Sequence, residues 1–272
     1  MLKTVAEVPT SITCFFAPEL RDPLNSGSVG VGITIDKVVK VSVSKGEELK
    51  ILLNGEPVDF PTVEFVAREL NFRGEIRIDT EIPIGCGFGV SGASSLACAF
   101  AINDLMNLNK SFFELADIAH KAEVINRTGL GDVVTQCFGG IVVRKTASCP
   151  SGCVVDKYLW NIELDILVID KLPTPEVLDK VKDVGKKYMK MFLKKPSVEN
   201  LFRCSKMFAM ESGLLDSEVK DVIEAVESED GLASMVMIGK AVFAINGEIL
   251  KEFNGTYFKA KVKHYGIKVL RC

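Results

Sequence analysis

Histidine is scarce in this 272-residue sequence, which has only His120 and His264, and its eight cysteines never form a Cys-x-x-Cys pair. Zinc centres draw their ligands mainly from such cysteine and histidine clusters, so no zinc centre is expected. Cys149 and Cys153, separated by Pro-Ser-Gly, could close a short disulfide or ligate a metal, and the sequence leaves these alternatives open. Cysteines within apolar stretches are expected to act as small hydrophobic residues.

A basic surplus and long apolar runs are also missing. The formal net charge is −3, whereas a dedicated nucleic-acid-binding protein usually carries an excess of lysine and arginine. No apolar run approaches the roughly 20 residues that span a bilayer, and residues 1–10 lack the apolar core of a signal peptide. We therefore expect a cytoplasmic protein that binds neither nucleic acid nor membrane. The sequence leaves its oligomeric state open, a homodimer included.

Apolar periodicity predicts alternating strands and helices in the first half of the chain. The expected strands are 11–16, 29–44, 48–53, 74–82 and 139–145, and the expected helices are 60–70, 93–106 and 111–126. Asn54-Gly55 is typical of a hairpin turn. The segment 93–106 is apolar almost all round, which predicts a helix buried in the centre of its domain. Ser111 and Glu114 have the spacing of a capping box.

The second half predicts helices on a mostly antiparallel sheet, an α+β arrangement. The expected strands are 162–169, 232–238, 241–245, 256–262 and 267–270, and the expected helices are 174–193, 197–212 and 217–228. A first domain that ends near Tyr158 divides the chain into residues 1–158 and 159–272.

A glycine-rich segment between a predicted strand and the buried helix carries the clearest chemical signal. Four glycines fall within eight positions of Pro83–Ser95. Glycine lets the backbone turn tightly and approach a ligand, and the free N–H groups at a helix start favour an anion. The segment therefore predicts a phosphate cradle, with serine hydroxyls that reach phosphate oxygens or Mg²⁺. The residues assigned to it are Pro83, Gly85, Gly87, Phe88, Gly89, Ser91, Gly92, Ala93, Ser94 and Ser95.

Other glycine-rich nucleotide motifs do not fit this segment. The third glycine comes too early for the Gly-x-Gly-x-x-Gly fingerprint of NAD-dependent oxidoreductases, and no Gly-Lys-Ser/Thr of a P-loop follows. A glycine-rich turn packed under a helix of small residues is the purely structural alternative. The proline before the glycines and the serines among them are better explained by ligand binding.

The segment Pro83-Ile-Gly-Cys-Gly-Phe-Gly-Val-Ser-Gly-Ala93 resembles the signature loop of the galactokinase, homoserine kinase, mevalonate kinase and phosphomevalonate kinase (GHMP) superfamily. The resemblance continues in order along the chain, through Ala17-Pro18, Ala122-Glu123, Thr128-Gly-Leu-Gly-Asp132 and Gly139-Gly140. It implies ATP and Mg²⁺ in a cleft between two domains. The first would be an α/β domain with a left-handed crossover, like the second domain of ribosomal protein S5. The second would be ferredoxin-like.

The same resemblance implies roles for two carboxylates. Glu123 would be a Mg²⁺ ligand, with Ser94 or Ser95 as the second ligand, and Asp132 would be the general base. These assignments suit the chemistry, because Mg²⁺ prefers a few hard oxygen ligands and phosphoryl transfer needs a carboxylate beside the acceptor hydroxyl. Two structural alternatives stay open: Glu123 as an exposed charge at a helix end, and Asp132 as the N-cap of a helix at 133–137.

Three longer segments are similar to the archaeal-type pantoate kinases of this superfamily. They are Asp22-Pro-Leu-Asn-Ser-Gly-Ser-Val-Gly-Val-Gly32, His120-Lys-Ala-Glu-Val-Ile-Asn-Arg-Thr-Gly-Leu-Gly-Asp-Val-Val134 and the stretch from Ala233 to Ala244. The resemblance implies that ATP and (R)-pantoate react to give (R)-4-phosphopantoate, a step toward coenzyme A. Mevalonate or homoserine kinase is the alternative within the superfamily, and a nucleotide sensor without activity is an alternative of another class.

Two departures from the superfamily pattern affect the predicted site. Many members carry a lysine after the N-terminal proline, whereas this chain has Glu19-Leu-Arg21, so Arg21 is the candidate catalytic cation. The third motif is reduced to Ala233-Ser234 and Gly239, so that wall of the site can be built differently.

The predicted acceptor site follows from the chemistry of pantoate, a carboxylate with two hydroxyl groups. An arginine suits a carboxylate, and Arg127 is best placed by sequence, although it can equally cap its helix. The complete set assigned to the substrate is Ser26, Gly27, Ser28, Arg127 and Thr128.

Overall fold

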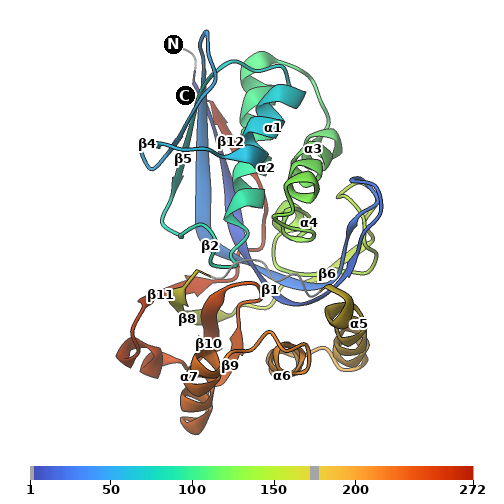
Figure 1. The fold of residues 1–272 in the computed structure, drawn as a ribbon, viewed down its shortest axis with the longest axis vertical. Helices are drawn as coiled ribbons and strands as arrows, with labels where there is room; N and C mark the ends of the chain where they lie inside the picture. The colour runs from blue at the N-terminus through green and yellow to red at the C-terminus, as the bar shows by residue number, and fades with distance from the viewer. Residues whose placement is uncertain (1–2, 172–177, 272) are drawn as a thin grey trace.

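The computed structural model describes residues 3–171 and 178–271, which form two β-sheets with helices packed against them (Figure 1). The first sheet has the strand order β12-β1-β2-β5-β3-β4, with β6 paired to β2 and β7 paired to β6. Its strands are β1 (Thr4–Glu19), β2 (Gly27–Lys45), β3 (Lys50–Leu53), β4 (Glu56–Pro57), β5 (Gly74–Thr80), β6 (Ile141–Arg144), β7 (Val155–Tyr158) and β12 (Lys268–Arg271). The second sheet has the order β11-β8-β10-β9. Its strands are β8 (Glu163–Asp170), β9 (Leu232–Met235), β10 (Lys240–Ile245) and β11 (Thr256–Lys261).

The helices of the first half cover one face of the first sheet (Figure 1). They are α1 (Pro61–Glu69), α2 (Val90–Met106), α3 (Phe112–Asn126) and α4 (Asp132–Phe138). Helix α2 contacts β1 and β2 on one side and α1 and α3 on the other, so most of its residues are buried. This confirms the burial expected from its apolar sequence. The capping box at the start of α3 is also confirmed, with both Ser111–Glu114 hydrogen bonds present.

The helices of the second half are α5 (Leu178–Lys194), α6 (Val198–Glu211) and α7 (Ser217–Ser228), followed by the short 3-10 helix η1 (Glu248–Glu252). Helices α6 and α7 pack on β9 of the second sheet, while α5 packs on β1 and α6. Residues 174–177 of the predicted helix lie outside the described residues. Aspartate Asp216, rather than Ser217, caps α7 by accepting the N–H of Val219.

One strand was predicted in the wrong sheet. Segment 267–270 was expected beside the other C-terminal strands, but β12 pairs antiparallel with β1 of the first sheet. The prediction also missed β7, because a strand of four residues with a polar centre is too short to give a periodic signal. The division at residue 158 stays a prediction, and β12 carries the end of the chain back to the first sheet.

The crossover expected in the first domain has a local counterpart. Strands β3 and β5 pair in parallel, and α1 connects them through the short hairpin strand β4. The left-handed sense of the crossover stays a prediction. Among the described residues, no helix has both the length and the apolar character to cross a membrane.

Candidate active site

The glycine-rich segment turns sharply from β5 into α2. Gly85, Gly87 and Gly89 have φ values of 86°, 83° and 60°, in the region that favours glycine. A side chain at Gly87 would meet the Met237 carbonyl oxygen at 2.9 Å. One at Gly89 would lie within 2.9 Å of Ser11, Gln136 and Asp132 side-chain atoms. Because these glycines lack side chains, the loop can pack directly against β1 and α4.

The start of α2 has the properties of an anion site. Gly89 is its N-cap, and no side chain caps the first N–H groups. Backbone N–H groups at such a terminus attract phosphate. Pro83 and Gly85 are exposed on the loop, whereas the Phe88 side chain is buried and packs near the Phe258 ring. Phe88 therefore anchors the loop, while Gly92, Ala93, Ser94 and Ser95 occupy the first turns of the helix.

The three serines of the segment differ in their contacts. Ser91 donates a hydrogen bond of 2.9 Å to Oε2 of Glu123. Ser94 donates to the Val90 carbonyl oxygen at 2.8 Å, one turn earlier in its own helix. The Ser95 hydroxyl is buried, and no described residue hydrogen-bonds to it. Ser91 is thus the serine that the fold brings to the predicted metal ligand.

Glu123 lies in the last turns of α3 with 1% of its surface exposed, so the alternative of an exposed helix-end charge is wrong. Its Oε1 atom is buried, and no described residue hydrogen-bonds to it. Burial raises the pKa of Glu123 to about 8, the hydrogen bond from Ser91 opposes this rise, and the nearby charge of Asp132 adds to it. A buried carboxylate with a free oxygen is well suited to a cation.

Asp132 is the first residue of α4, and the N-cap is Gly131. The N-cap alternative for Asp132 is therefore wrong. Its Oδ1 accepts hydrogen bonds from Ser11 at 3.0 Å and Thr13 at 3.4 Å, both on β1. Burial raises the pKa of Asp132, and the charge of Arg144 and these two hydroxyls oppose the rise.

Gly129 separates the two carboxylates. A side chain built at Gly129 would meet Oε2 of Glu123 at 2.8 Å and Oδ2 of Asp132 at 3.2 Å. Both carboxylates therefore border the same small space next to Gly129, close to the start of α2. This arrangement places a potential cation ligand and a potential base side by side.

The serines assigned to the substrate lie at the start of β2, with Gly27 between them. Ser26 is buried, and its hydroxyl accepts the N–H of Arg21 at 2.8 Å. Ser28 accepts two hydrogen bonds from Arg144, at its carbonyl oxygen (3.1 Å) and its hydroxyl (3.3 Å). At Gly27 a side chain would come within 2.6 Å of the Ser148 backbone nitrogen, so the chain at 147–148 packs directly on this loop.

The two predicted arginines lie at the surface. The Arg21 side chain is 63% exposed and pairs with Glu19 at 3.4 Å. Arg127 is exposed and is the C-cap of α3, with a φ of 56°. The alternative of Arg127 as a helix cap is thus confirmed. The Thr128 hydroxyl donates to the Glu123 carbonyl oxygen at 3.3 Å.

Sequence reasoning missed Arg144, a completely buried cation on β6. Its guanidinium also donates to the Thr135 hydroxyl at 2.5 Å, and a side chain at Gly131 would lie 2.7 Å from its Cζ. Arg144 therefore packs against Gly131, the residue before Asp132, and its charge acts on the Asp132 carboxylate. Its signal in the sequence was a charge that ends the otherwise apolar strand Ile141–Arg144.

His120 was also missed as a site residue. Its ring is buried on α3, and Nε2 lies 2.9 Å from the Ser26 carbonyl oxygen. Burial lowers the pKa of His120, and the contact with Ser26 opposes the effect. His120 therefore holds the loop that carries Ser26 and Ser28.

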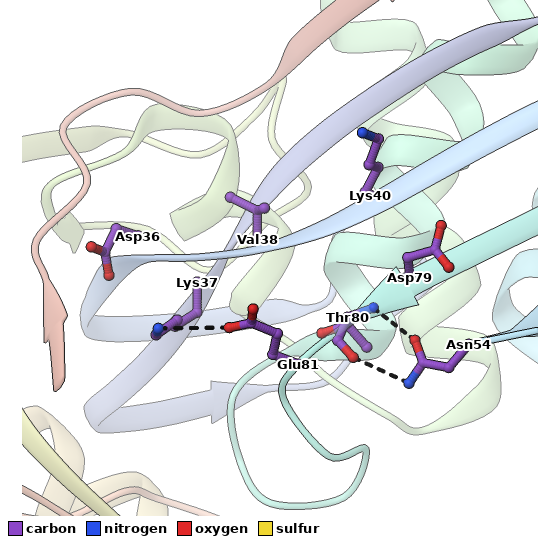
Figure 2. Close-up of a pocket in the computed structure, with 8 residues that line it drawn as sticks. All are labelled: Asp36, Lys37, Val38, Lys40, Asn54, Asp79, Thr80 and Glu81. Atoms are coloured by element: carbon purple, nitrogen blue, oxygen red, sulfur yellow. Dashed lines mark hydrogen bonds and ion pairs between the residues drawn. The ribbon is translucent and has the colours of Figure 1, made fainter. Parts of the chain in front are cut away.

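A surface depression lies between β2, β5 and the turn after β3 (Figure 2). Lys37 forms an ion pair with Glu81 across it at 3.6 Å, and the Asn54 side chain pairs with the backbone of Thr80. The full lining consists of Asp36, Lys37, Val38, Lys40, Asn54, Asp79, Thr80 and Glu81. Glu81 leads two residues later into Pro83, so the depression adjoins the glycine-rich segment.

Comparison with known proteins identifies the family of this chain. A model of the GHMP kinases N terminal domain matches residues 60–140. The pantoate kinase of Methanocaldococcus jannaschii is 32% identical over 88% of this chain and 91% of its own length. That of Methanospirillum hungatei is 30% identical over 99% of this chain and 97% of its own length. The chain belongs to the pantoate kinase family of the GHMP kinases. A solved structure described as a phosphotransferase related to the CoA biosynthesis pathway is 29% identical, with a TM-score of 0.90 over 99% of both chains.

Membership of this family confirms the resemblance found in the sequence motifs and the GHMP-kinase fold. It also confirms the prediction of an ATP-dependent small-molecule kinase. The individual residue roles stay predictions.

Proposed function

We propose that the protein transfers the γ-phosphoryl group of ATP to (R)-pantoate, giving (R)-4-phosphopantoate in the synthesis of coenzyme A. The observation that carries this proposal is similarity to pantoate kinases over nearly the full length of both chains. We also propose a cytoplasmic location for this reaction.

The nucleotide would bind at the start of α2. The uncapped N–H groups of the helix and the turns at Gly85, Gly87 and Gly89 would hold the phosphates. The nucleoside would extend toward the depression in Figure 2, since Glu81 on its rim leads into the loop. This assignment uses the backbone for phosphate binding and leaves the serines for the metal.

The donor set near the phosphates suits Mg²⁺. Mg²⁺ needs few protein ligands, because it keeps waters and binds phosphate oxygens. Glu123 would supply the carboxylate, and Ser91 or Ser95 the hydroxyl, since Ser91 already contacts Glu123 and the Ser95 hydroxyl has a free oxygen. Ser94 remains a candidate, although its hydroxyl bonds its own helix. When bound, Mg²⁺ would neutralise charge that develops on the transferred group.

The acceptor would lie between Asp132 and the start of β2. Asp132 would accept the proton of the attacking hydroxyl as general base. Ser26, Ser28 and Thr128 would surround the hydroxyl groups, and the carboxylate would face Arg144, whose planar fork suits it. Arg144 is better placed than Arg127 for this role because it is buried beside Asp132. Arg21 and Arg127 would attract the anionic substrate from the outer edge.

Measurement of ADP release with ATP and Mg²⁺ tests the proposal. Pantoate, mevalonate, homoserine and pantothenate are compared as acceptors for the unaltered protein and for Asp132→Asn. Asp156→Asn is the matched control, because Asp156 is an exposed aspartate on β7 whose side chain pairs with Lys145 and accepts the Lys157 N–H. We expect turnover with pantoate alone, reduced by about 100-fold or more in Asp132→Asn and unchanged in the control.

Turnover of another acceptor would contradict pantoate as the substrate but would still support a small-molecule kinase. ATP binding without release of ADP with any acceptor would favour the sensor alternative. Full activity of Asp132→Asn would exclude Asp132 as the base.

A further inference from the structure

Gln136 connects the proposed base, Asp132, to residues 83–89 of the glycine-rich segment, which would hold the phosphates of ATP and are called the phosphate loop below. It lies on α4, one turn after Asp132, and is fully buried. Its Nε2 donates to the Gly89 carbonyl oxygen at 2.8 Å and to the Ser11 hydroxyl at 3.1 Å. The side chain therefore contacts the last residue of the glycine-rich loop and a residue of β1 at the same time.

The chemistry of these partners fixes the orientation of the amide. The Gly89 carbonyl oxygen can only accept a hydrogen bond, so the atom that faces it must be the nitrogen of Gln136. The two protons of this nitrogen then serve Gly89 and Ser11. With the amide reversed, two oxygens would face each other at 2.8 Å in a buried site, which costs free energy.

The Ser11 hydroxyl has one proton, and the amide of Gln136 decides where it points. Because the hydroxyl oxygen accepts from Gln136, its own proton is free for another partner. Oδ1 of Asp132 lies 3.0 Å away and is the acceptor of that proton. The result is a directed chain of hydrogen bonds in which Gln136 donates to Ser11 and Ser11 donates to Asp132.

We propose that Gln136 is a positioning residue for phosphoryl transfer: it directs the Ser11 hydroxyl to Asp132 and ties this base to the Gly89 end of the phosphate loop. The proposal rests on the proposed function, in which Asp132 is the base and the loop holds ATP. A hydrophobic residue of similar size would fill the space of Gln136, but the Ser11 hydroxyl would lose the donor that orients it. The Gly89 carbonyl would lose its hydrogen bond from α4 and keep the one from the Ala93 N–H.

The surroundings of Asp132 explain why this link is needed. Thr13 also donates to Oδ1 but at 3.4 Å, a long contact. Arg144 on β6 and Glu123 on α3 act on Asp132 through their charges, with no described hydrogen bond to it. The hydrogen bond from Ser11 is therefore the shorter of the two described hydrogen bonds to Asp132, and it sets the direction of the carboxylate.

The link also joins three elements that are distant in sequence. The N–H of Ser11 donates to the Phe88 carbonyl oxygen at 3.0 Å, and Gln136 donates to that of Gly89, so β1 and α4 hold two successive residues of the loop. A side chain at Gly89 would collide with Ser11, Gln136 and the Cβ of Asp132. The distance between phosphate loop and base is thus set by direct contact, as in-line transfer requires.

A double-mutant cycle with Ser11→Ala and Gln136→Met tests the proposal. We expect Ser11→Ala to lower kcat by about 10- to 100-fold and to leave the KM values nearly unchanged, because the acceptor and ATP do not touch Ser11 in this arrangement. We expect Gln136→Met to lower kcat by a similar factor and to raise the KM for ATP, because the Gly89 carbonyl loses the hydrogen bond that ties it to α4 and keeps the one from Ala93 within α2. The double variant should fall no further in kcat than Ser11→Ala, within about twofold.

Thr10→Val is the matched control, since Thr10 is a buried hydroxyl on the same strand that bonds Lys37 instead of Asp132. Its kcat should equal that of the unaltered protein. If the kcat losses of the two single variants multiply in the double variant, Gln136 does not act through Ser11 and the proposal is overturned. Unchanged kcat in Gln136→Met would overturn it as well. Gln136→Leu replaces Gln136→Met if the latter does not fold.

Failure of the proposed function gives a different result. If another acceptor is turned over, the same cycle is run with that acceptor. If none is, the side-chain amide protons of Gln136 are observed by NMR. We expect slow exchange with solvent, and a shifted resonance in Ser11→Ala. Fast exchange, or no response to Ser11→Ala, would overturn the link itself.

Discussion

Gly131→Ala should weaken use of the acceptor without weakening ATP binding. The backbone of Gly131 has a φ of −142°, which any residue adopts, so the substitution adds contacts without backbone strain. The new methyl group would meet the Ser28 hydroxyl at 2.6 Å and the Arg144 guanidinium at 2.7 Å from Cζ and 2.8 Å from Nε. Both partners are buried, and Arg144 is held by Ser28 and Thr135.

The distances give the size of the effect. Ordinary contact begins at 3.4 Å, so Arg144 or Ser28 must move by about 0.7 Å. The Arg144–Ser28 hydrogen bonds of 3.1 and 3.3 Å would then exceed hydrogen-bonding distance. A hydrogen bond to a charged group contributes about 1.5–3 kcal/mol. Loss of one such bond corresponds to a decrease of about 10- to 150-fold in kcat/KM for pantoate.

The assay compares kcat/KM for pantoate with the dissociation constant of a non-hydrolysable ATP analogue. Gly46→Ala is the control, because Gly46 directly follows β2 and its new methyl group would meet backbone atoms of Gly74 and Glu48, the nearest being Gly74 Cα at 3.2 Å. We expect the analogue to bind equally well to all three proteins. A kcat/KM in Gly131→Ala equal to that of the control would refute the placement of the acceptor beside Arg144.

Three further predictions concern the metal, the pH dependence of stability and the core. Glu123→Gln should raise the Mg²⁺ concentration for half-maximal rate by about tenfold or more, and an unchanged Mg²⁺ requirement would exclude Glu123 as a ligand. The pKa of His120 is lower in the folded protein than its ordinary value of 6.5, so below pH 7 this side chain binds a proton more readily in the unfolded chain. The free energy of unfolding should therefore fall as the pH drops from 7 to 5.5. Urea unfolding should show a smaller fall for His120→Gln, and an equal fall would contradict this cause. Phe192→Ala removes a buried ring packed against Phe15, Tyr158 and Trp160 and should cost about 3–5 kcal/mol. The melting temperature should then fall by about 10 °C, and a fall of only 1 or 2 °C would show that the core closes around the gap.

Features set by neighbouring residues were predictable from the sequence. The capping box of Ser111 and Glu114 needs only three residues of context, and the glycine turns before α2 are equally local. The apolar character of α2 was enough to predict its burial, since a helix without a polar face has no side for solvent.

Features set by distant residues were not predictable in the same way. The partners of Asp132 on β1 are about 120 residues away in sequence, and no local pattern pairs them. Nearness in sequence selected Arg127, but the fold also places Arg144, on β6, where its charge acts on Asp132. For β12, four residues of strand character indicate a strand but do not say which edge it joins.

The return of β12 to β1 has a consequence for synthesis of the chain. Residues Thr4–Glu7 of β1 find their outer neighbour only at 268–271, about 260 residues later. At about 5–20 residues per second, the growing chain carries this open strand edge for roughly 13 to 50 seconds. Unpaired strand edges can pair with other chains, so the outer edge of β1 is open to aggregation until residues 268–271 have been made. The same pairing places Thr4 opposite Arg271, so a short linker from β12 to β1 would yield a circular permutant in which β12 precedes β1.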